Sequence, residues 1–206
     1  MPTLTGHTNS ETVPLGFGGV SASVGDHIAH FYRGSSQMFN VLGPYVAEGI
    51  RRGDKCVVIS SPKVAEQLLE WFTLQGTDAE NARASGQLLL HAGETSQDDM
   101  RALVGKVEAT SLKAGYKFVR WAGDGGWALA GKTSVEEMLC WEALYDKVSV
   151  NWKILALCQF DLTQFSGDAV MDALRSHPLC IMGDVLSPNP FHVSPETLLK
   201  ELKERE

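Results

Sequence analysis

Arg120-Trp121-Ala122-Gly123-Asp124-Gly125-Gly126-Trp127 and Leu157-Cys158-Gln159-Phe160-Asp161 are two short runs that each contain an apolar, β-prone segment reaching a carboxylate. In an open α/β sheet, the side chains at the carboxyl ends of parallel strands line the ligand crevice. If both runs are parallel strands, Asp124 and Asp161 lie at the same edge of one sheet. The sequence therefore predicts a binding pocket at that edge.

Strand-like and helix-like segments alternate around these two runs. Strands are expected at residues 27–32, 55–60, 86–91, 116–121, 150–160 and 179–185. Helices are expected at residues 35–52, 64–74, 97–113, 134–148 and 168–175. This alternation is typical of βαβ units, and a length of 206 residues suits one domain. We therefore predict a single-domain α/β protein with a mostly parallel central sheet flanked by helices.

The two ends of the chain differ from this core in composition. Residues 1–24 are rich in glycine, threonine and serine and are predicted to form a flexible tail. Residues 25–193 are the expected domain, and residues 194–206 are expected to form a charged helix. There is neither the basic and apolar pattern of a signal peptide nor an apolar run of ~18 residues.

Charge and cysteine usage narrow the class of protein further. The net charge is -7 and no basic residues cluster, which argues against direct binding of nucleic acid. The four cysteines lie far apart with no CxxC pair, and three of them lie in apolar strand-like runs. We therefore expect reduced thiols and a cytoplasmic protein that does not contact a membrane.

A carboxylate lies in the middle of an apolar helical face. The residues that share this face are Val135, Met138, Leu139 and Glu142. Burying an unpaired charge is costly, so Glu142 needs a partner, and Arg120 in the preceding strand is the candidate. Two interpretations stay open: a structural salt bridge and a pair that lines a pocket.

The aspartates and tryptophans of the first two runs also allow two interpretations. Asp124 and Asp161 are suited to binding a cation, orienting water or hydrogen-bonding a ligand, or they cap the loops that follow their strands. Trp121 and Trp127 either line an apolar pocket or pack in the core.

His27 and His177 are candidate ligand contacts, although an isolated histidine is more often an ordinary hydrogen-bonded residue. Together with Cys158 they would form a metal site only if the fold brought all three together. Their spacing is not that of a metal-binding motif, so no metal is predicted.

Gly126–Thr133 matches the phosphate-binding pattern GxxxxGK[ST]. It follows a predicted strand and opens a helix, and Asp161 would then bind magnesium. This alternative is a nucleotide-binding enzyme that uses ATP and Mg²⁺. The interior of the match, Trp127 to Ala130, is bulky and apolar, unlike a loop that encloses phosphate, so the nucleotide-binding enzyme is the second choice.

Several short motifs together resemble the MEDS family, the methanogen/methylotroph, DcmR-type sensory domains, from Asp26 to Phe191. The matching motifs are Asp26-His27 with Tyr32, Gly49 to Ile59, Gly86-Gln87-Leu88, Arg120 to Trp127, Glu142, Leu157 to Asp161, and His177-Pro178. Asp124 replaces the family's usual glutamate, and Phe160 replaces its usual tyrosine. The segment after Glu94 is shorter than in the family.

The resemblance implies a RecA-like three-layer fold that has lost its nucleotide-binding loops. It also implies a non-enzymatic domain that senses small organic molecules of the hydrocarbon-derivative type for transcriptional or signalling control. No cofactor is expected, and the partners are the ligand and a regulator protein; a homodimer and a pure protein-interaction module stay open. The expected ligand contacts are His27, Tyr32, Arg120, Asp124, Trp127, Glu142, Cys158, Phe160, Asp161 and His177.

Overall fold

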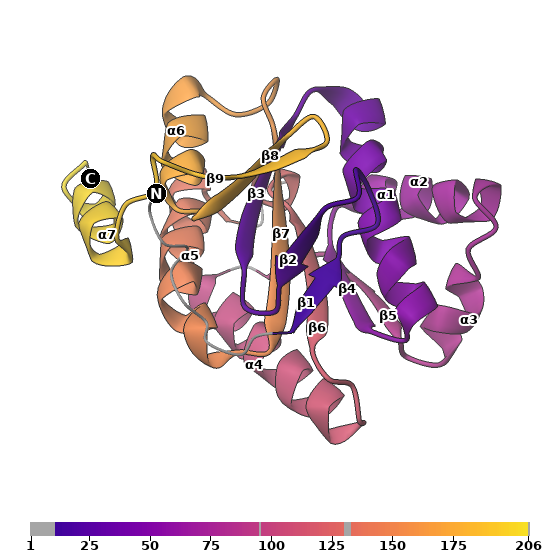
Figure 1. Ribbon diagram of the computed structural model, residues 1–206. Coiled ribbons are helices and arrows are strands. Elements are labelled where there is room, and N and C mark those ends of the chain that lie inside the picture. Colours follow the sequence, from indigo (N-terminus) through magenta and orange to yellow (C-terminus); the bar gives the residue numbers. More distant parts are fainter. Residues whose placement is uncertain (1–10, 95, 130–132, 206) are drawn as a thin grey trace.

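The computed structural model describes residues 11–94, 96–129 and 133–205 (Figure 1). A seven-stranded sheet in the order β5-β4-β6-β7-β3-β8-β9 forms its centre, and a separate hairpin pairs β1 with β2. All neighbours in the large sheet are parallel except β8 and β9. The strands are β1 (Thr12–Pro14), β2 (Ser21–Ser23), β3 (His27–Tyr32), β4 (Lys55–Ile59), β5 (Leu88–His91), β6 (Val119–Asp124), β7 (Ile154–Asp161), β8 (Leu179–Met182) and β9 (Val185–Pro188).

Helices cover both faces of the large sheet (Figure 1). The helices of one face are α1 (Gly34–Arg52), α2 (Pro62–Leu74) and α3 (Ala79–Ala84). Those of the other face are α4 (Gln97–Lys113), α5 (Val135–Val148), α6 (Gly167–Arg175) and α7 (Pro195–Lys203), with the short 3-10 turn η2 (Ser149–Asn151) after α5. This arrangement confirms the predicted three-layer α/β architecture with a mostly parallel central sheet. None of the described helices is both long and apolar enough to cross a membrane.

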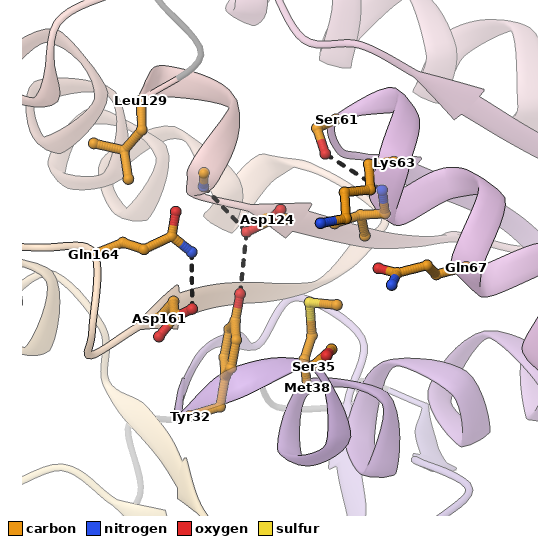
Figure 2. Close-up of a pocket in the computed structure, with 12 residues that line it drawn as sticks. Tyr32, Ser35, Met38, Ser61, Lys63, Gln67, Asp124, Leu129, Asp161 and Gln164 are labelled. Atoms are coloured by element: carbon orange, nitrogen blue, oxygen red, sulfur yellow. Dashed lines mark hydrogen bonds between the residues drawn. The ribbon is translucent and has the colours of Figure 1, made fainter.

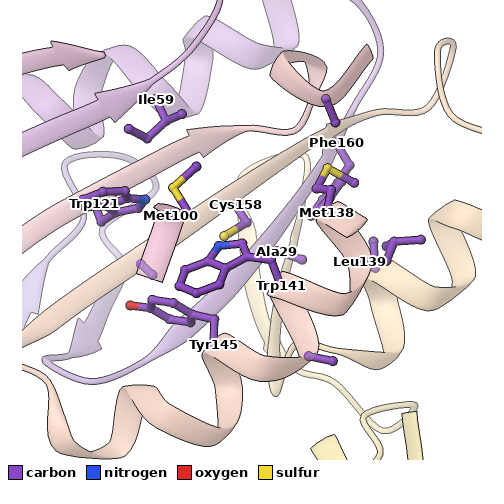
Figure 3. Packing of buried hydrophobic residues seen from close by; sticks show 14 of the residues in the cluster. Ala29, Ile59, Met100, Trp121, Met138, Leu139, Trp141, Tyr145, Cys158 and Phe160 are labelled. Atoms are coloured by element: carbon purple, nitrogen blue, oxygen red, sulfur yellow. The ribbon is translucent and has the colours of Figure 1, made fainter. Parts of the chain in front are cut away.

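Strand alternation divides the core into two clusters, one on each side of the sheet. In β7, Ala156 and Cys158 pack toward α4, α5 and α6, while Leu155 and Leu157 pack toward α1 and α2. The whole strand is buried, as expected for a central strand covered on both faces. Figure 3 shows part of the cluster on the α5 side.

The N-terminal segment is ordered where the structure describes it, so the predicted flexible tail is wrong for residues 11–24. β1 and β2 form an antiparallel hairpin there. Val13 and Leu15 are fully buried in the cluster on the α1 side, which holds the hairpin against the sheet. The Gly- and Ser-rich composition suggested a tail because only alternate residues of this short hairpin are apolar. Residues 1–10 lie outside the described part of the chain.

The predicted C-terminal helix is confirmed as α7. Leu198 and Leu202 bury its apolar side in the same cluster as α4, α5 and α6. β9 was not predicted, because its four residues carry no strong strand pattern; it pairs with β8 through a tight turn that contains Gly183.

Arg120 is a buried structural residue on the α1 side, so the predicted pair with Glu142 is wrong. Its Nε donates to Asp54 Oδ2 at 2.7 Å, and its Nη2 donates to the Pro14 carbonyl at 2.9 Å. The guanidinium also lies 5.3 Å from the centre of the Tyr45 ring. Arg120 and Trp121 point to opposite faces because strand side chains alternate, and Glu142 lies on the Trp121 side.

A glycine makes room for this buried cation. A Cβ added at Gly49 of α1 would lie 2.6 Å from Arg120 Cδ and 2.5 Å from Cys56 Sγ. The helix therefore packs closely over Arg120 because residue 49 has no side chain. This explains the glycine in the middle of an otherwise ordinary helix.

Replacing Arg120 with methionine is predicted to lower the free energy of unfolding by about 3 kcal/mol, because the largely buried Asp54 loses its hydrogen-bonded partner and keeps only Arg52, at 3.6 Å. Arg51→Met is the matched control, since Arg51 is exposed and pairs with Glu48 on the surface. Because that pair is exposed to solvent, its loss should cost much less than the loss of the buried pair. Urea unfolding of both variants measures the difference, and equal losses would contradict a structural role for the buried pair.

His30 is a second buried polar residue on the α1 side of the sheet. It is 1% exposed, and Gln159 Nε2 donates a hydrogen bond to its Nδ1 at 2.9 Å. Burial lowers the pKa of His30 to about 4. The ring is therefore neutral in the folded protein at pH 5 and above.

This burial should make stability depend on pH. The unfolded chain takes up a proton at His30 below pH 6.5, but the folded chain does so only near pH 4. The stability that depends on a neutral His30 is fully present above pH 6.5 and is lost as pH falls. The loss reaches about 2 kcal/mol at pH 5. We predict that wild-type protein loses this much more free energy of unfolding between pH 7.5 and pH 5 than His30→Asn, which keeps an acceptor for Gln159. Equal losses in urea unfolding would show that His30 is protonated in the folded state.

Candidate functional site

A crevice of about 420 Å³ lies at the carboxyl ends of the central strands (Figure 2). We call it the strand-end crevice. β3, β6 and β7 contribute Tyr32, Asp124 and Asp161, the polar residues at or near their ends. These three side chains lie on the α1 side of the sheet, because each occupies an alternate position that faces that side. The predicted pocket at the strand ends is therefore present.

The two aspartates of the crevice are held by hydrogen bonds. Tyr32 Oη donates to Asp124 Oδ1 at 3.4 Å, and the Gly126 N–H donates to the same oxygen at 3.1 Å. Thr163 donates to Asp161 Oδ1 from both its N–H and its hydroxyl, at 2.9 and 2.8 Å. Gln164 Nε2 donates to Asp161 Oδ2 at 2.8 Å. Both carboxylates are therefore fixed in orientation before any ligand binds.

The environment separates the two aspartates in acidity. Burial raises the pKa of Asp124, an effect that the hydrogen bonds from Gly126 and Tyr32 only partly offset. Burial also opposes ionisation of Asp161, but the hydrogen bonds from Gln164 and Thr163 lower its pKa overall. Asp124 is thus the carboxyl group that more readily holds a proton, and Asp161 is the firmer anion.

The opposite wall of the crevice comes from the first two turns of α1 and of α2. Ser35 and Met38 belong to α1, and Lys63 and Gln67 belong to α2. Ser61 begins α2, where its hydroxyl accepts a hydrogen bond from the backbone of the first turn. Figure 2 shows these side chains around the space in front of Asp124 and Asp161.

Four donor side chains meet on the other face of the sheet. We call them the buried histidine cluster: His27, Glu142, Cys158 and His177. They come from β3, α5, β7 and the turn between α6 and β8. Their donor atoms all lie within 4.8 Å of one another, and every one of these residues is buried.

Burial has the largest effect on the pKa of each residue in the buried histidine cluster, and Glu142 interacts with the other three. Burial opposes its ionisation, but His177 and His27 bring the pKa of Glu142 down to about 2. Burial alone would lower the pKa of His27, yet Asp146 and Glu142 raise it. Burial and the charge on His27 lower the pKa of His177. Burial raises the pKa of the Cys158 thiol, and Glu142 adds to this effect.

A small cavity of about 20 Å³ adjoins the buried histidine cluster. Glu142 and Cys158 form part of its wall, and Trp121, Trp141 and Tyr145 form an aromatic part. Figure 3 shows these three rings beside Cys158. A space of this size holds about one water molecule, so it does not admit an organic ligand.

The residues predicted to contact a ligand therefore fall into two groups, not one. The group in the strand-end crevice is Tyr32, Asp124 and Asp161. The group in the buried histidine cluster is His27, Glu142, Cys158 and His177. His27 and His177 do converge, with ring centroids 3.9 Å apart.

The three other predicted contacts lie outside both groups. Trp127 lines the small cavity, and Arg120 belongs to the ion pair on the α1 side. Phe160 is 1% exposed in the core, where its ring meets the edge of His177 at 5.6 Å. Phe160 therefore does not line the strand-end crevice; it packs beside the buried histidine cluster.

Some site residues were missed by sequence reasoning. Lys63 and Gln164 follow the ends of β4 and β7, so the same argument that selected Asp124 and Asp161 would have found them. Asp146 lies one helical turn after Glu142 and therefore on the same face of α5. Its Oδ1 is 3.7 Å from His27 Nδ1, and the helical spacing from Glu142 could have identified it.

The match to a phosphate-binding loop, Gly126–Thr133, lies partly outside the described residues, because residues 130–132 are not described. Gly126 to Leu129 are helical and follow β6 directly. Gly126 donates its N–H to Asp124. The described half is therefore a helical turn that supports a crevice carboxylate.

Comparisons with known proteins give one family. The family described as MEthanogen/methylotroph, DcmR Sensory domain (MEDS) matches residues 26–178. The transcriptional repressor DcmR of Methylorubrum extorquens is 28% identical over 163 residues, which are 77% of this chain and 60% of DcmR. The chain thus spans about 60% of the length of that relative.

Among solved structures, the flagellar accessory protein FlaH from Methanocaldococcus jannaschii is similar with a TM-score of 0.49. The superposition covers 79% of this chain and 75% of FlaH, at 11% sequence identity.

Proposed function

The chain belongs to the MEDS family of sensory domains, and we propose that it is a cytoplasmic, non-enzymatic domain that binds a small organic molecule in the strand-end crevice. The observation that carries the proposal is the pair of oriented carboxyl groups, Asp124 and Asp161, facing an open crevice. The family and the similarity to a transcriptional repressor support a sensory role in regulation.

The dimensions of the crevice favour a small ligand. Its volume of about 420 Å³ falls within the range of about 300–1,000 Å³ found for small-molecule pockets. Two carboxyl groups and the Tyr32 hydroxyl lie on one side, and Lys63 lies on the other. Met38 and Val64 add apolar surface. Such a site suits a short hydrocarbon derivative.

The polar groups suggest how that ligand would be oriented. A hydroxyl or amine on the ligand would donate to Asp161, the firmer anion, while Asp124 would accept or donate according to its protonation. The carbon skeleton would pack against Met38 and Val64. Hydrogen bonds to a charged group contribute about 1.5–3 kcal/mol, so the carboxylates would dominate the selection.

The crevice joins elements that a ligand would draw together. α1, α2 and the turn after β7 each supply part of its wall. A ligand changes output only by binding two conformations with different affinity, so one with closer contacts among these elements would be favoured. We propose that a transcriptional or signalling regulator reads this change, since the matched region is only part of DcmR.

A thermal-shift screen of short alcohols, amines, aldehydes and haloalkanes tests the proposal. At least one class should raise the melting temperature of the wild-type protein. Asp124→Asn and Asp161→Asn should weaken its affinity by about 10–100-fold, because each removes a charged hydrogen-bond partner. Asp184→Asn, in the exposed turn between β8 and β9, is the matched control and should bind like wild type.

Two results would count against the crevice as a sensor. A compound that binds all three variants equally well would have to occupy another site. Stabilisation by magnesium-ATP that is lost in Lys132→Ala, with no response to organic compounds, would replace the sensory proposal by nucleotide binding.

A further inference from the structure

We propose that the buried histidine cluster binds one divalent transition-metal ion, and that zinc fits its donors best. The proposal reverses the expectation from sequence spacing, because the donors come together only through the order of the strands. The site lies on the α5 side of the sheet, whereas the strand-end crevice lies on the α1 side. It is therefore spatially separate from the proposed ligand site, and the proposal does not rest on that site.

The distances within the cluster match a small coordination shell. Glu142 Oε2 lies 3.2 Å from His27 Nε2 and 3.5 Å from His177 Nε2. Cys158 Sγ lies 3.5 Å from His27 Nε2. Zinc bonds of about 2.0–2.3 Å in a tetrahedron place neighbouring donor atoms about 3.3–3.7 Å apart. These three pairs are thus close to the spacing that one central ion requires, and all four donor atoms lie within 4.8 Å of one another.

The tautomer of His177 directs a lone pair into this space. His177 Nδ1 lies 2.6 Å from the Ala173 carbonyl and donates its proton there, so the neutral ring has its lone pair on Nε2. Among the described residues, this buried Nε2 has no hydrogen-bond partner. For the neutral ring, Nε2 and the carboxylate of Glu142 are then two acceptors that face each other across 3.5 Å. A cation between them satisfies both.

Asp146 lies behind His27, on the side where metal-bound histidines usually have a supporting carboxylate, and among the described residues His27 Nδ1 makes no hydrogen bond. Its Oδ1 lies 3.7 Å from His27 Nδ1, on the far side of the ring from Glu142. His192 Nε2 lies 2.9 Å from Asp146 Oδ2 and helps to hold the carboxylate. A carboxylate behind an imidazole fixes the ring orientation and strengthens the ring nitrogen as a ligand. The cluster therefore has an inner and an outer layer of polar groups.

The set of donors selects the ion. Two imidazole nitrogens, one thiolate and one carboxylate form a borderline-soft set of four, which suits zinc better than magnesium or calcium. The site is buried, and the cavity beside it has room for about one water. Four protein ligands in a closed setting are typical of a structural site. The ion would tie α5 and the end of α6 to the two central strands.

Metal content of the chain, purified without a polyhistidine tag and dialysed against metal-free buffer, tests the site. We expect close to one zinc ion per chain in the wild type and a loss of at least tenfold in Cys158→Ala. Cys56→Ala is the matched control, since Cys56 is an equally buried thiol on the opposite face of the sheet. It should retain the metal.

A second measurement on the wild type does not depend on whether a variant folds. Chelator-treated protein should gain about 10 °C in melting temperature at a free zinc concentration about 1,000-fold above Kd. Cobalt should give a thiolate-to-metal absorption band that zinc then removes. Absence of both the thermal shift and the band in the wild type would overturn the proposal, as would full metal content in Cys158→Ala.

Discussion

The parallel register of β3, β7 and β6 is the constraint on which both sites depend. Tyr32 stands opposite Asp161, and Asp124 stands opposite Gln159, so the polar strand ends meet at one edge. The same register places His27 near Cys158 on the other face. Because side chains alternate, a shift of one residue would exchange the two faces and dissolve both sites together. Burial of these strands on both faces fixes their register, and the register in turn fixes which side chains meet in each site.

Arg120 and Glu142 are buried charged residues on opposite faces of the sheet, and their charges are compensated in different ways. On the α1 side, Arg120 has a fixed opposite charge in Asp54 and a carbonyl acceptor in Pro14. On the α5 side, Glu142 faces two imidazoles, one of which presents a lone pair to it. The first arrangement pairs opposite charges within the protein and is structural, although Arg120 Nη1 has no hydrogen-bond partner among the described residues. In the second, the facing acceptor atoms of Glu142 and His177 would both be satisfied by a cation, so we assign metal binding to it.

The limits of sequence reasoning follow from what local patterns contain. Strand ends alone placed Asp124 and Asp161 in one crevice, because parallel strands share a carboxyl edge. Helical periodicity correctly marked Glu142 as a buried carboxylate, but periodicity does not tell which face of the sheet a helix covers, so Arg120 was the wrong partner. The meeting of His27 with Cys158 requires β3 and β7 to be neighbours. Strand order is a property of the whole chain and is not present in either segment.

α6 connects the two sites by a direct route. The helix begins after the turn in which Gln164 holds Asp161, at the edge of the strand-end crevice. It ends just before His177, whose Nδ1 donates to the Ala173 carbonyl of the same helix. Ala169 and Ala173 are buried, and their small side chains keep the helix close to the sheet. The strands between the sites are packed on both faces, whereas α6 runs along the α5 side from the turn of Gln164 to the turn of His177. A ligand that contacts Gln164 therefore meets the turn that leads into the helix whose other end positions His177.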